Sequence, residues 1–132
     1  MKDDIQKMIV QFQILEANLK ALQERAEIMN ERLEEIKNTK IALEELEEAK
    51  PSKALVSIGI GSFVSGTIEN TKDVIIGVGS GVAIKKKRED AIAILESRSK
   101  ETETSLNEIS NQSTKIAFQL AKIQEEIEKL QR

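Results

Sequence analysis

Two stripes of mostly apolar residues run along opposite ends of this chain in alternating steps of three and four. The first stripe begins at Ile5 and ends at Leu43, and the second begins at Ile92 and ends at Leu130. Such stepping is typical of a coiled-coil seam. Residue numbers matched from opposite ends sum to 135, from Ile5 with Leu130 to Leu43 with Ile92. A single chain achieves this pairing by folding back on itself, so we predict a long antiparallel two-helix coiled coil with both termini at its far tip.

Each stripe has twelve members, and neither stripe slips out of register. One charged residue, Lys40, interrupts the first stripe, and three small polar residues interrupt the second. The first stripe comprises Ile5, Met8, Phe12, Leu15, Leu19, Leu22, Ala26, Met29, Leu33, Ile36, Lys40 and Leu43. The second comprises Ile92, Leu95, Ser99, Thr102, Leu106, Ile109, Ser113, Ile116, Leu120, Ile123, Ile127 and Leu130.

Composition favours an elongated protein over a globular one, because 33% of the 132 residues are charged and only 2% are aromatic. The chain has no cysteine and no histidine. This excludes disulfide frameworks, Cys or His metal sites, thiol nucleophiles and histidine-dependent triads. We expect no cofactor and no bound metal. The net charge of -3 offers little attraction for nucleic acid or an anionic membrane.

The sequence is that expected of a soluble, cytoplasmic protein. Acidic residues at Asp3 and Asp4 stand where a signal peptide has basic ones. The least polar run, Val74 to Ile84, is too short to span a bilayer. The carboxylates lie on exposed helical faces without a concave site to perturb them, so we expect no enzymatic activity.

The middle of the chain has a different character, since all six glycines lie between Gly59 and Gly81 and the only proline, Pro51, marks the end of the first helix. Four short runs rich in valine and isoleucine follow and predict two β-hairpins in series. The runs are Leu55–Ile58, Phe63–Ile68, Val74–Gly77 and Val82–Ile84. The chain is thus predicted to be a single domain, mainly α with a small β part: a first helix at 1–50, a double hairpin at 51–86 and a second helix at 87–132.

Hairpins this small need other structure to pack against, because the segment is shorter than the roughly 40 residues of an independent core. Their apolar runs are nearly continuous, which predicts burial on both faces or edge pairing with another chain. The alternative is that the hairpins fold over the ends of their own helices. The predicted assembly residues are Leu55, Val56, Ile58, Phe63, Val64, Ile68, Val74, Ile75, Ile76, Val78, Val82 and Ile84.

Some apolar residues fall outside the seam. Ile9, Val10, Ile14 and Phe118 lie toward the far tip, where we expect them to meet solvent. Such a patch marks an interaction site, although scattered surface apolar residues are the alternative. Ile41, Leu46 and Ile94 lie near the hairpins, and packing against the strands would explain them.

Two motifs resemble sites of other proteins. The glycine clusters at 59–61 and 77–81 resemble phosphate-binding loops, but each is followed by a strand rather than a helix, so hairpin turns are the better interpretation. The basic run 85–88 resembles a nucleic-acid patch. The register of 135 sets it near Glu44, Glu45, Glu47 and Glu48, which predicts mutual neutralisation instead.

The whole chain resembles the α-class subunits of prefoldin, a hexameric chaperone of archaeal and eukaryotic cytosol. The most specific stretches are 54–64, 78–83 and 89–92, and two hairpins rather than one indicate the α class. Two departures are Ser57, where many members carry proline, and Lys87, where a serine or threonine often caps the second helix.

The resemblance implies that two α and four β subunits join their hairpins into β-barrels, leaving the coiled coils as tentacles. It implies ATP-independent holding of unfolded polypeptides at the tips and their transfer to a group II chaperonin. Members of the seam would contribute to client binding only where the end frays. The predicted client-contacting residues are Ile5, Met8, Ile9, Val10, Phe12, Ile14, Phe118, Ile123, Ile127 and Leu130. The alternative function is a structural coiled-coil scaffold or a filament-forming prefoldin-like protein.

Overall fold

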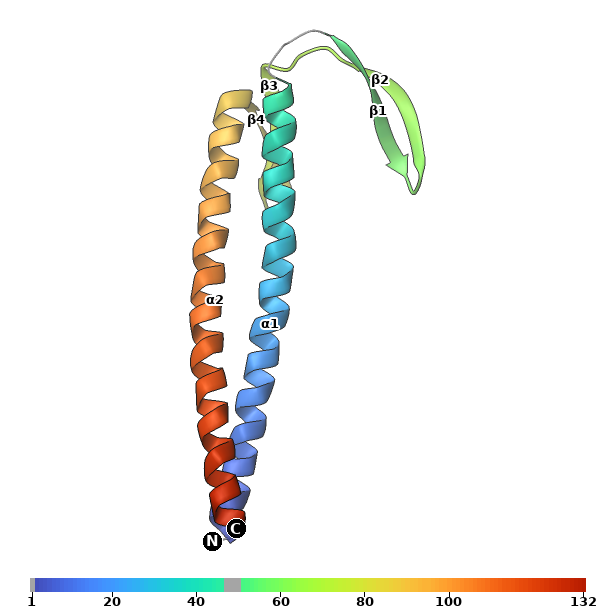
Figure 1. The fold of residues 1–132 in the computed structure, drawn as a ribbon. Helices are drawn as coiled ribbons and strands as arrows, with labels where there is room; N and C mark the ends of the chain where they lie inside the picture. Colours follow the sequence, from blue (N-terminus) through green and yellow to red (C-terminus); the bar gives the residue numbers. More distant parts are fainter. Residues whose placement is uncertain (1, 47–50) are drawn as a thin grey trace. The chain divides into compact units, whose positions relative to one another are not determined.

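The computed structural model describes residues 2–46 and 51–132 and contains two long helices joined by two β-hairpins (Figure 1). This confirms the predicted fold class. Each of the four strands extends one or more residues beyond its predicted run, and the second helix begins one residue later than predicted. The elements are α1 (Lys2–Glu45), β1 (Ser52–Gly59), β2 (Ser62–Ile68), β3 (Asp73–Gly79), β4 (Val82–Lys87) and α2 (Arg88–Gln131).

The chain divides into two compact units. One, here called the terminal unit, combines the chain up to Glu34 with Lys100–Arg132. Within it α1 and α2 run antiparallel, and the start of α1 lies beside the end of α2 (Figure 1). The other, the hairpin unit, comprises Glu35–Ser99 and contains all four strands.

The burial of each helix follows the predicted seam. In α1, all twelve stripe members are partly buried, and every other residue of the helix is exposed. In α2, all twelve stripe members are likewise buried or partly buried. Leu95 and Ile109 are among the most buried side chains, at 4% and 7% exposed. The stepping of three and four therefore identifies the buried face residue by residue.

The first part of α2 buries a second face, which the stripe does not include. Ala91 is fully buried, and Arg88, Ile94 and Arg98 are partly buried. The Arg98 guanidinium donates a hydrogen bond from Nη2 to the carbonyl of Gly77 at 2.7 Å. This contact joins Arg98, a member of the second face, to the end of β3.

The two hairpins differ in how much of their own chain covers them. In β3–β4, Val74, Ile76 and Ile84 are partly buried on one face, whereas Ile75 on the other face is 76% exposed. In β1–β2 most side chains on both faces are exposed. The alternative of hairpins folded onto their own helices thus applies to one face of β3–β4, and β1–β2 is left largely uncovered.

Both hairpins close through two-residue turns with a bulge before the turn. At the second turn Ser80 and Gly81 both have positive φ, of 53° and 75°, as a type I′ turn requires. At the first turn Gly61 has positive φ, of 65°. The glycine clusters therefore form hairpin turns, as predicted, and each leads into a strand.

The start of α2 lacks a side-chain cap, because Lys87 belongs to β4 and the helix follows it directly. The backbone N–H of Arg88 donates instead to the carbonyl of Lys72 at 2.8 Å. The Arg88 guanidinium donates to the carbonyl of Leu43 at 3.4 Å, in the last turn of α1, where carbonyls lack helical partners. One arginine thus ties the start of α2 to the end of α1.

The ion pairs of the basic run 85–88 differ from the predicted pairing with glutamates at the end of the first helix. Lys85 pairs with Asp73 in its own hairpin at 4.0 Å, and Glu44 pairs with Lys40 at 3.7 Å. Glu47 and Glu48 lie outside the described residues. Of the off-seam residues near the strands, Ile94 and Leu46 are partly buried, and packing against the strands stays a prediction for them; for Ile41, which is 51% exposed, the prediction is wrong.

Lys40, the charged member of the seam, donates to Glu96 at 2.8 Å. Glu96 follows Leu95, the residue that the register of 135 sets against Lys40. The hydrogen bond to the Glu96 carboxylate raises the pKa of Lys40 above its ordinary value of 10.5. A charged seam residue that finds a partner in one register favours that register over its neighbours.

Replacing Leu95 by alanine should lower the free energy of unfolding by about 2–4 kcal/mol, because a buried leucine loses its contacts and leaves a cavity. The matched control is Ile28→Ala on the exposed face of α1, which we expect to change stability by less than about 0.5 kcal/mol. Urea unfolding followed by circular dichroism measures both. Equal effects of the two substitutions would contradict the seam.

The ion pair of Lys40 predicts a pH dependence of stability. A pKa raised in the folded state contributes stability that is present below 10.5 and is lost as the pH rises through the folded-state value. The unfolding free energy of the wild type should therefore fall relative to that of Lys40→Met as the pH rises above 10.5, and the difference should be constant at lower pH. Urea titrations of both proteins below and above this pH test it, and a difference that stays constant throughout would refute it.

Candidate functional site

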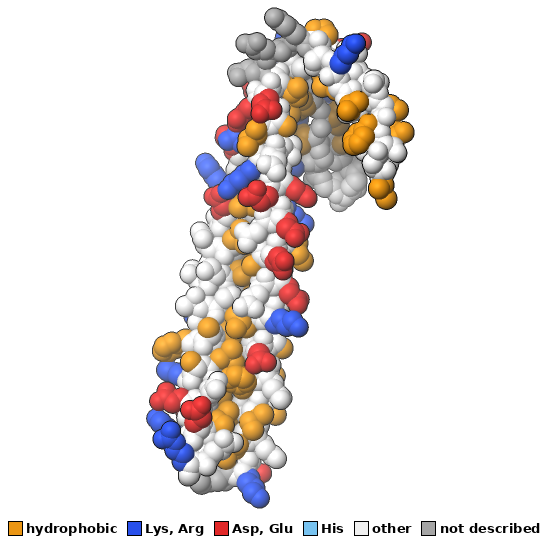
Figure 2. Space-filling view, turned by 45° about the vertical axis from the view of Figure 1, so that its right-hand side comes forward, with side chains coloured by type: hydrophobic (Ala, Val, Ile, Leu, Met, Phe, Trp, Pro, Cys, Tyr) orange, Lys and Arg blue, Asp and Glu red, His pale blue; other side chains and the backbone are white. Residues whose placement is uncertain are grey.

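Four apolar side chains of the terminal unit lie outside the seam and are exposed, as predicted. They are Ile9, Val10 and Ile14 of α1 and Phe118 of α2, with exposed fractions of 38%, 53%, 56% and 63%. We call these four residues the terminal patch. Figure 2 shows hydrophobic side chains gathered over this unit between charged ones. Because the seam uses one face of each helix, apolar residues at other positions remain in contact with water.

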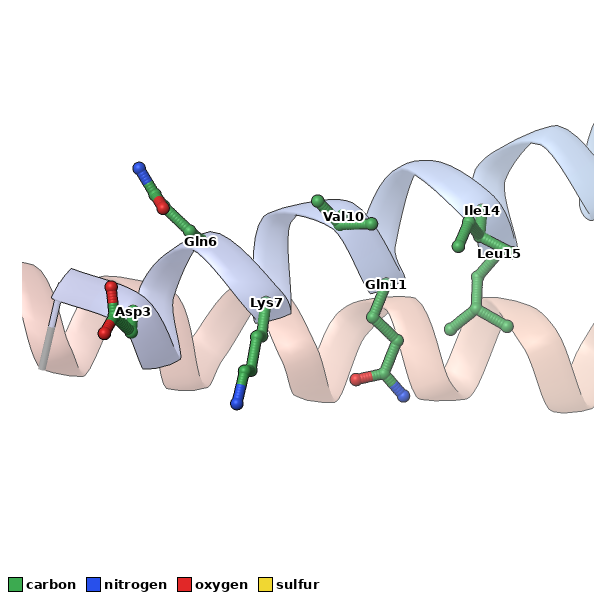
Figure 3. Close-up of a pocket in the computed structure, with 7 residues that line it drawn as sticks. All are labelled: Asp3, Gln6, Lys7, Val10, Gln11, Ile14 and Leu15. Atoms are coloured by element: carbon green, nitrogen blue, oxygen red, sulfur yellow. The ribbon is translucent and has the colours of Figure 1, made fainter.

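On α1, two members of the patch, Val10 and Ile14, line a shallow groove of about 580 Å³. Lys7, Gln11 and Leu15 point to one side of the helix, and Gln6 and Val10 point to the other (Figure 3). The groove is lined by three aliphatic side chains and by the amide side chains of Gln6 and Gln11. The aliphatic groups can contact apolar side chains of a ligand, and the amides can form hydrogen bonds with its exposed peptide groups. Its lining residues are Asp3, Gln6, Lys7, Val10, Gln11, Ile14 and Leu15.

On α2 the patch is aromatic and basic. Phe118 lines a second shallow depression, of about 430 Å³, together with Thr114, Lys115, Gln119 and Lys122. The Lys122 ammonium lies over the ring, with Nζ 5.1 Å from the ring centroid, within the range of a cation–π interaction. The two sides of the patch thus differ in chemistry.

The predicted client-contacting residues fall into two groups. The four members of the terminal patch are exposed and available to a ligand. The other six are seam members that are buried or partly buried between the helices, so they become available only if the end of the coiled coil frays. These six are Ile5, Met8, Phe12, Ile123, Ile127 and Leu130. That any of the ten contacts a client stays a prediction.

The predicted assembly residues also fall into two groups. Leu55, Val56, Ile58, Phe63, Val64, Ile75, Val78 and Val82 are exposed. Ile68, Val74, Ile76 and Ile84 are partly buried. An isolated two-stranded hairpin is marginally stable in water, so an uncovered β1–β2 is typical of a surface that pairs with another chain.

Residues 2–46 and 51–132 contain no group of three or more Asp or Glu side chains close enough to hold a metal ion. The described helices include none that is both long enough and apolar enough to cross a membrane. What the patch offers is apolar contact area in two places, one on each helix.

Comparison with known proteins agrees with this architecture. The model of the prefoldin family, described as "Prefoldin subunit", matches residues 15–132. The chain belongs to the prefoldin family. The matched range includes both hairpins, all of α2 and most of α1. It begins after Ile14, so family membership alone assigns no role to the α1 side of the terminal patch.

Curated relatives point to the α class within the family. "Prefoldin subunit alpha" of Pyrococcus horikoshii is 29% identical over 131 residues, covering 97% of this chain and 88% of that protein. The "Prefoldin subunit alpha" of Thermococcus onnurineus is 35% identical, covering 75% and 69% respectively. "Prefoldin subunit alpha 1" of Thermococcus kodakarensis is 36% identical, covering 74% and 67%.

Among solved structures, a cryo-EM structure of filamentous PFD from Methanocaldococcus jannaschii has a similar fold, with a TM-score of 0.57. The match covers 96% of this chain and 99% of the other, at 17% identity. At that identity the similarity concerns the fold alone.

Sequence reasoning missed three features around these surfaces. The Arg98 contact to β3 and the Arg88 contacts to Lys72 and Leu43 depend on which backbone carbonyls come near, and periodicity carries no signal for this. The basic surroundings of Phe118 could have been predicted from the sequence. Lys115 lies three residues before Phe118 and Lys122 four residues after it, which places both on the same helical face.

Proposed function

We propose that this chain is the α subunit of a cytoplasmic, ATP-independent chaperone that holds unfolded polypeptides at the terminal patch and passes them to a group II chaperonin. The observation that carries the proposal is the terminal patch itself, an apolar surface outside the seam, in a chain of the prefoldin family. Holding an unfolded polypeptide requires apolar contact and no catalysed reaction. This requirement is met by a family of non-enzymatic chaperone subunits.

Assembly forms the second part of the proposal. Two copies of this chain and four β-class subunits would join their hairpins into β-barrels, with β1–β2 contributing most because its faces are the least covered. Pairing would bury Leu55, Ile58 and Phe63, which are 71%, 65% and 57% exposed in the single chain. Each buried side chain of this size contributes roughly 1.5–3 kcal/mol, enough for several together to hold an assembly.

The assembly also explains how a small patch can hold a client. Several coiled coils around one polypeptide turn successive contacts into intramolecular ones, so that weak individual contacts add up to useful affinity. Weak contacts also permit release, which a transfer to a chaperonin requires. Exposed aliphatic side chains with amide neighbours have little sequence preference, which suits clients of many kinds.

A scaffold or filament is the second candidate. The exposed faces and edges of β1–β2 favour it, since strands that pair head to tail without closing would polymerise rather than form a hexamer. Native mass discriminates between the two: a closed hexamer has one mass, and a filament has a ladder of masses.

The test of holding is the light scattering of a chemically unfolded protein diluted, without ATP, into the oligomer assembled from this chain and its partner subunit. We expect Val10→Ser with Ile14→Ser to raise the concentration needed for half-suppression by about tenfold, because two apolar contacts are lost on each α subunit. The matched control is Ile28→Ser with Ile41→Ser on the same helix, at 60% and 51% exposure, which should leave suppression unchanged.

Both variants should keep the native mass and the helical circular dichroism of the wild type, since all four side chains are exposed. Equal suppression by the two variants would show that the terminal patch of α1 does not hold clients. Absence of suppression by the wild type would favour the scaffold.

A further inference from the structure

The α2 side of the terminal patch combines an exposed aromatic ring with two cations. Phe118 is 63% exposed and lines a depression of about 430 Å³ with Lys115 and Lys122. The Lys122 ammonium is held over the ring at 5.1 Å. An apolar side chain in this depression would therefore contact the ring within reach of two ammonium groups.

The surroundings of Phe118 on α2 contain no carboxylate. From Ile109 to Gln124 the helix has no Asp or Glu, and its charged residues are Lys115 and Lys122. The next acidic residue, Glu125, pairs with Lys129 at 3.4 Å. In the part of the chain that the structure describes, no ion pair joins Lys115 or Lys122 to a carboxylate. The nearest carboxylates to Lys122 along the helix are Glu125 and Glu126, three and four residues after it, and neither forms an ion pair with it, so the positive charge beside Phe118 is available to a ligand.

The rest of the terminal unit does not share this imbalance. On α1 the register of 135 sets residues 11–26 against this stretch, and there Glu16 and Glu24 balance Lys20 and Arg25. The α1 groove has one acidic and one basic residue among its lining residues, Asp3 and Lys7, and is also balanced. The whole chain carries a net charge of -3. Attraction for an acidic ligand is therefore a local property of the Phe118 side.

We propose that the Phe118 side of the terminal patch selects unfolded segments in which an apolar side chain stands beside Asp or Glu. The apolar side chain packs on the Phe118 ring, and the neighbouring carboxylate pairs with Lys115 or Lys122. This inference rests on the proposed holding function and adds a substrate class to it. The α1 side contributes apolar contact without charge preference. It therefore adds affinity for any client, whereas the Phe118 side adds selectivity for acidic segments.

The size of the preference follows from the exposure of the charges. Ion pairs at exposed sites are weak and screened by salt, so two of them should favour an acidic segment by about threefold to tenfold at low ionic strength. Charge also speeds association, because the local field attracts the segment before contact. The preference should disappear at about 0.5 M salt, while apolar binding persists.

The experiment uses three fluorescent, disordered peptides that share one Leu- and Phe-containing core and differ in its flanks, which are Asp, Asn or Lys. Anisotropy titration with the intact oligomer gives each dissociation constant. We expect the Asp peptide to bind the wild type about threefold to tenfold more tightly than the Asn peptide, and the Lys peptide to bind less tightly than either.

The diagnostic variant is Lys115→Gln with Lys122→Gln, which should bring the ratio between the Asp and Asn peptides to about one and leave the Asn peptide within about twofold of its wild-type affinity. The matched control is Lys20→Gln with Arg25→Gln on α1, which removes the same charge from the same unit and should keep the ratio. Phe118→Ala should weaken both peptides, because it removes the shared apolar contact.

The outcomes separate the two proposals. Equal binding of the Asp and Asn peptides to the wild type, or equal loss of the ratio in both double variants, overturns the charge preference and leaves holding intact. Absence of binding by all three peptides overturns holding and this inference with it. If a single-stranded DNA oligonucleotide displaces the Asp peptide from the wild type and from Phe118→Ala alike, the lysines form a general anion site, and the assignment to polypeptide segments is wrong.

Discussion

Burial of one stripe on each helix is the interaction on which the rest of this structure depends. The twelve partly buried residues of α1 are the same twelve that step by three and four in the sequence. Since a seam of this kind covers one face, each helix keeps a wide exposed surface. In the terminal unit an apolar residue placed off the stripe is therefore exposed, which is how Val10, Ile14 and Phe118 come to face water. The same interaction that orders the helices creates the surface proposed to bind clients.

Hydrogen bonds to backbone carbonyls join α2 to the β3–β4 region and to α1, in addition to the partly buried apolar face of β3–β4. Arg98 reaches the Gly77 carbonyl, and Arg88 contacts both Lys72 and Leu43 through backbone carbonyls. These contacts fix β3–β4 and the start of α2 within the hairpin unit, while β1–β2 keeps most of its apolar side chains exposed. The division gives the two hairpins different roles in the proposed assembly: one is tied to its own helix, and the other is open to partners.

The sequence predicts the periodic parts of this protein well, because periodicity is what burial imposes on helices and strands. The seam positions, the two hairpins and their glycine turns, and the exposure of the terminal patch all follow from spacing. Contacts in which a side chain of one element reaches a backbone carbonyl of another do not follow from spacing. The hydrogen bond from Arg98 to Gly77 is an example. The exposed Ile41 shows the same limit, since apolar character near a hairpin does not determine which face the hairpin covers.

The most direct test of the account is to place a photo-crosslinking amino acid at single positions of this chain in the assembled oligomer and to illuminate it with a labelled unfolded client. Positions 14 and 118 belong to the terminal patch, and positions 28 and 41 are equally exposed apolar positions outside it. The account predicts strong client crosslinks from 14 and 118 and weak ones from 28 and 41. Uniform crosslinking from all four positions, or crosslinking from 28 and 41 alone, would contradict it.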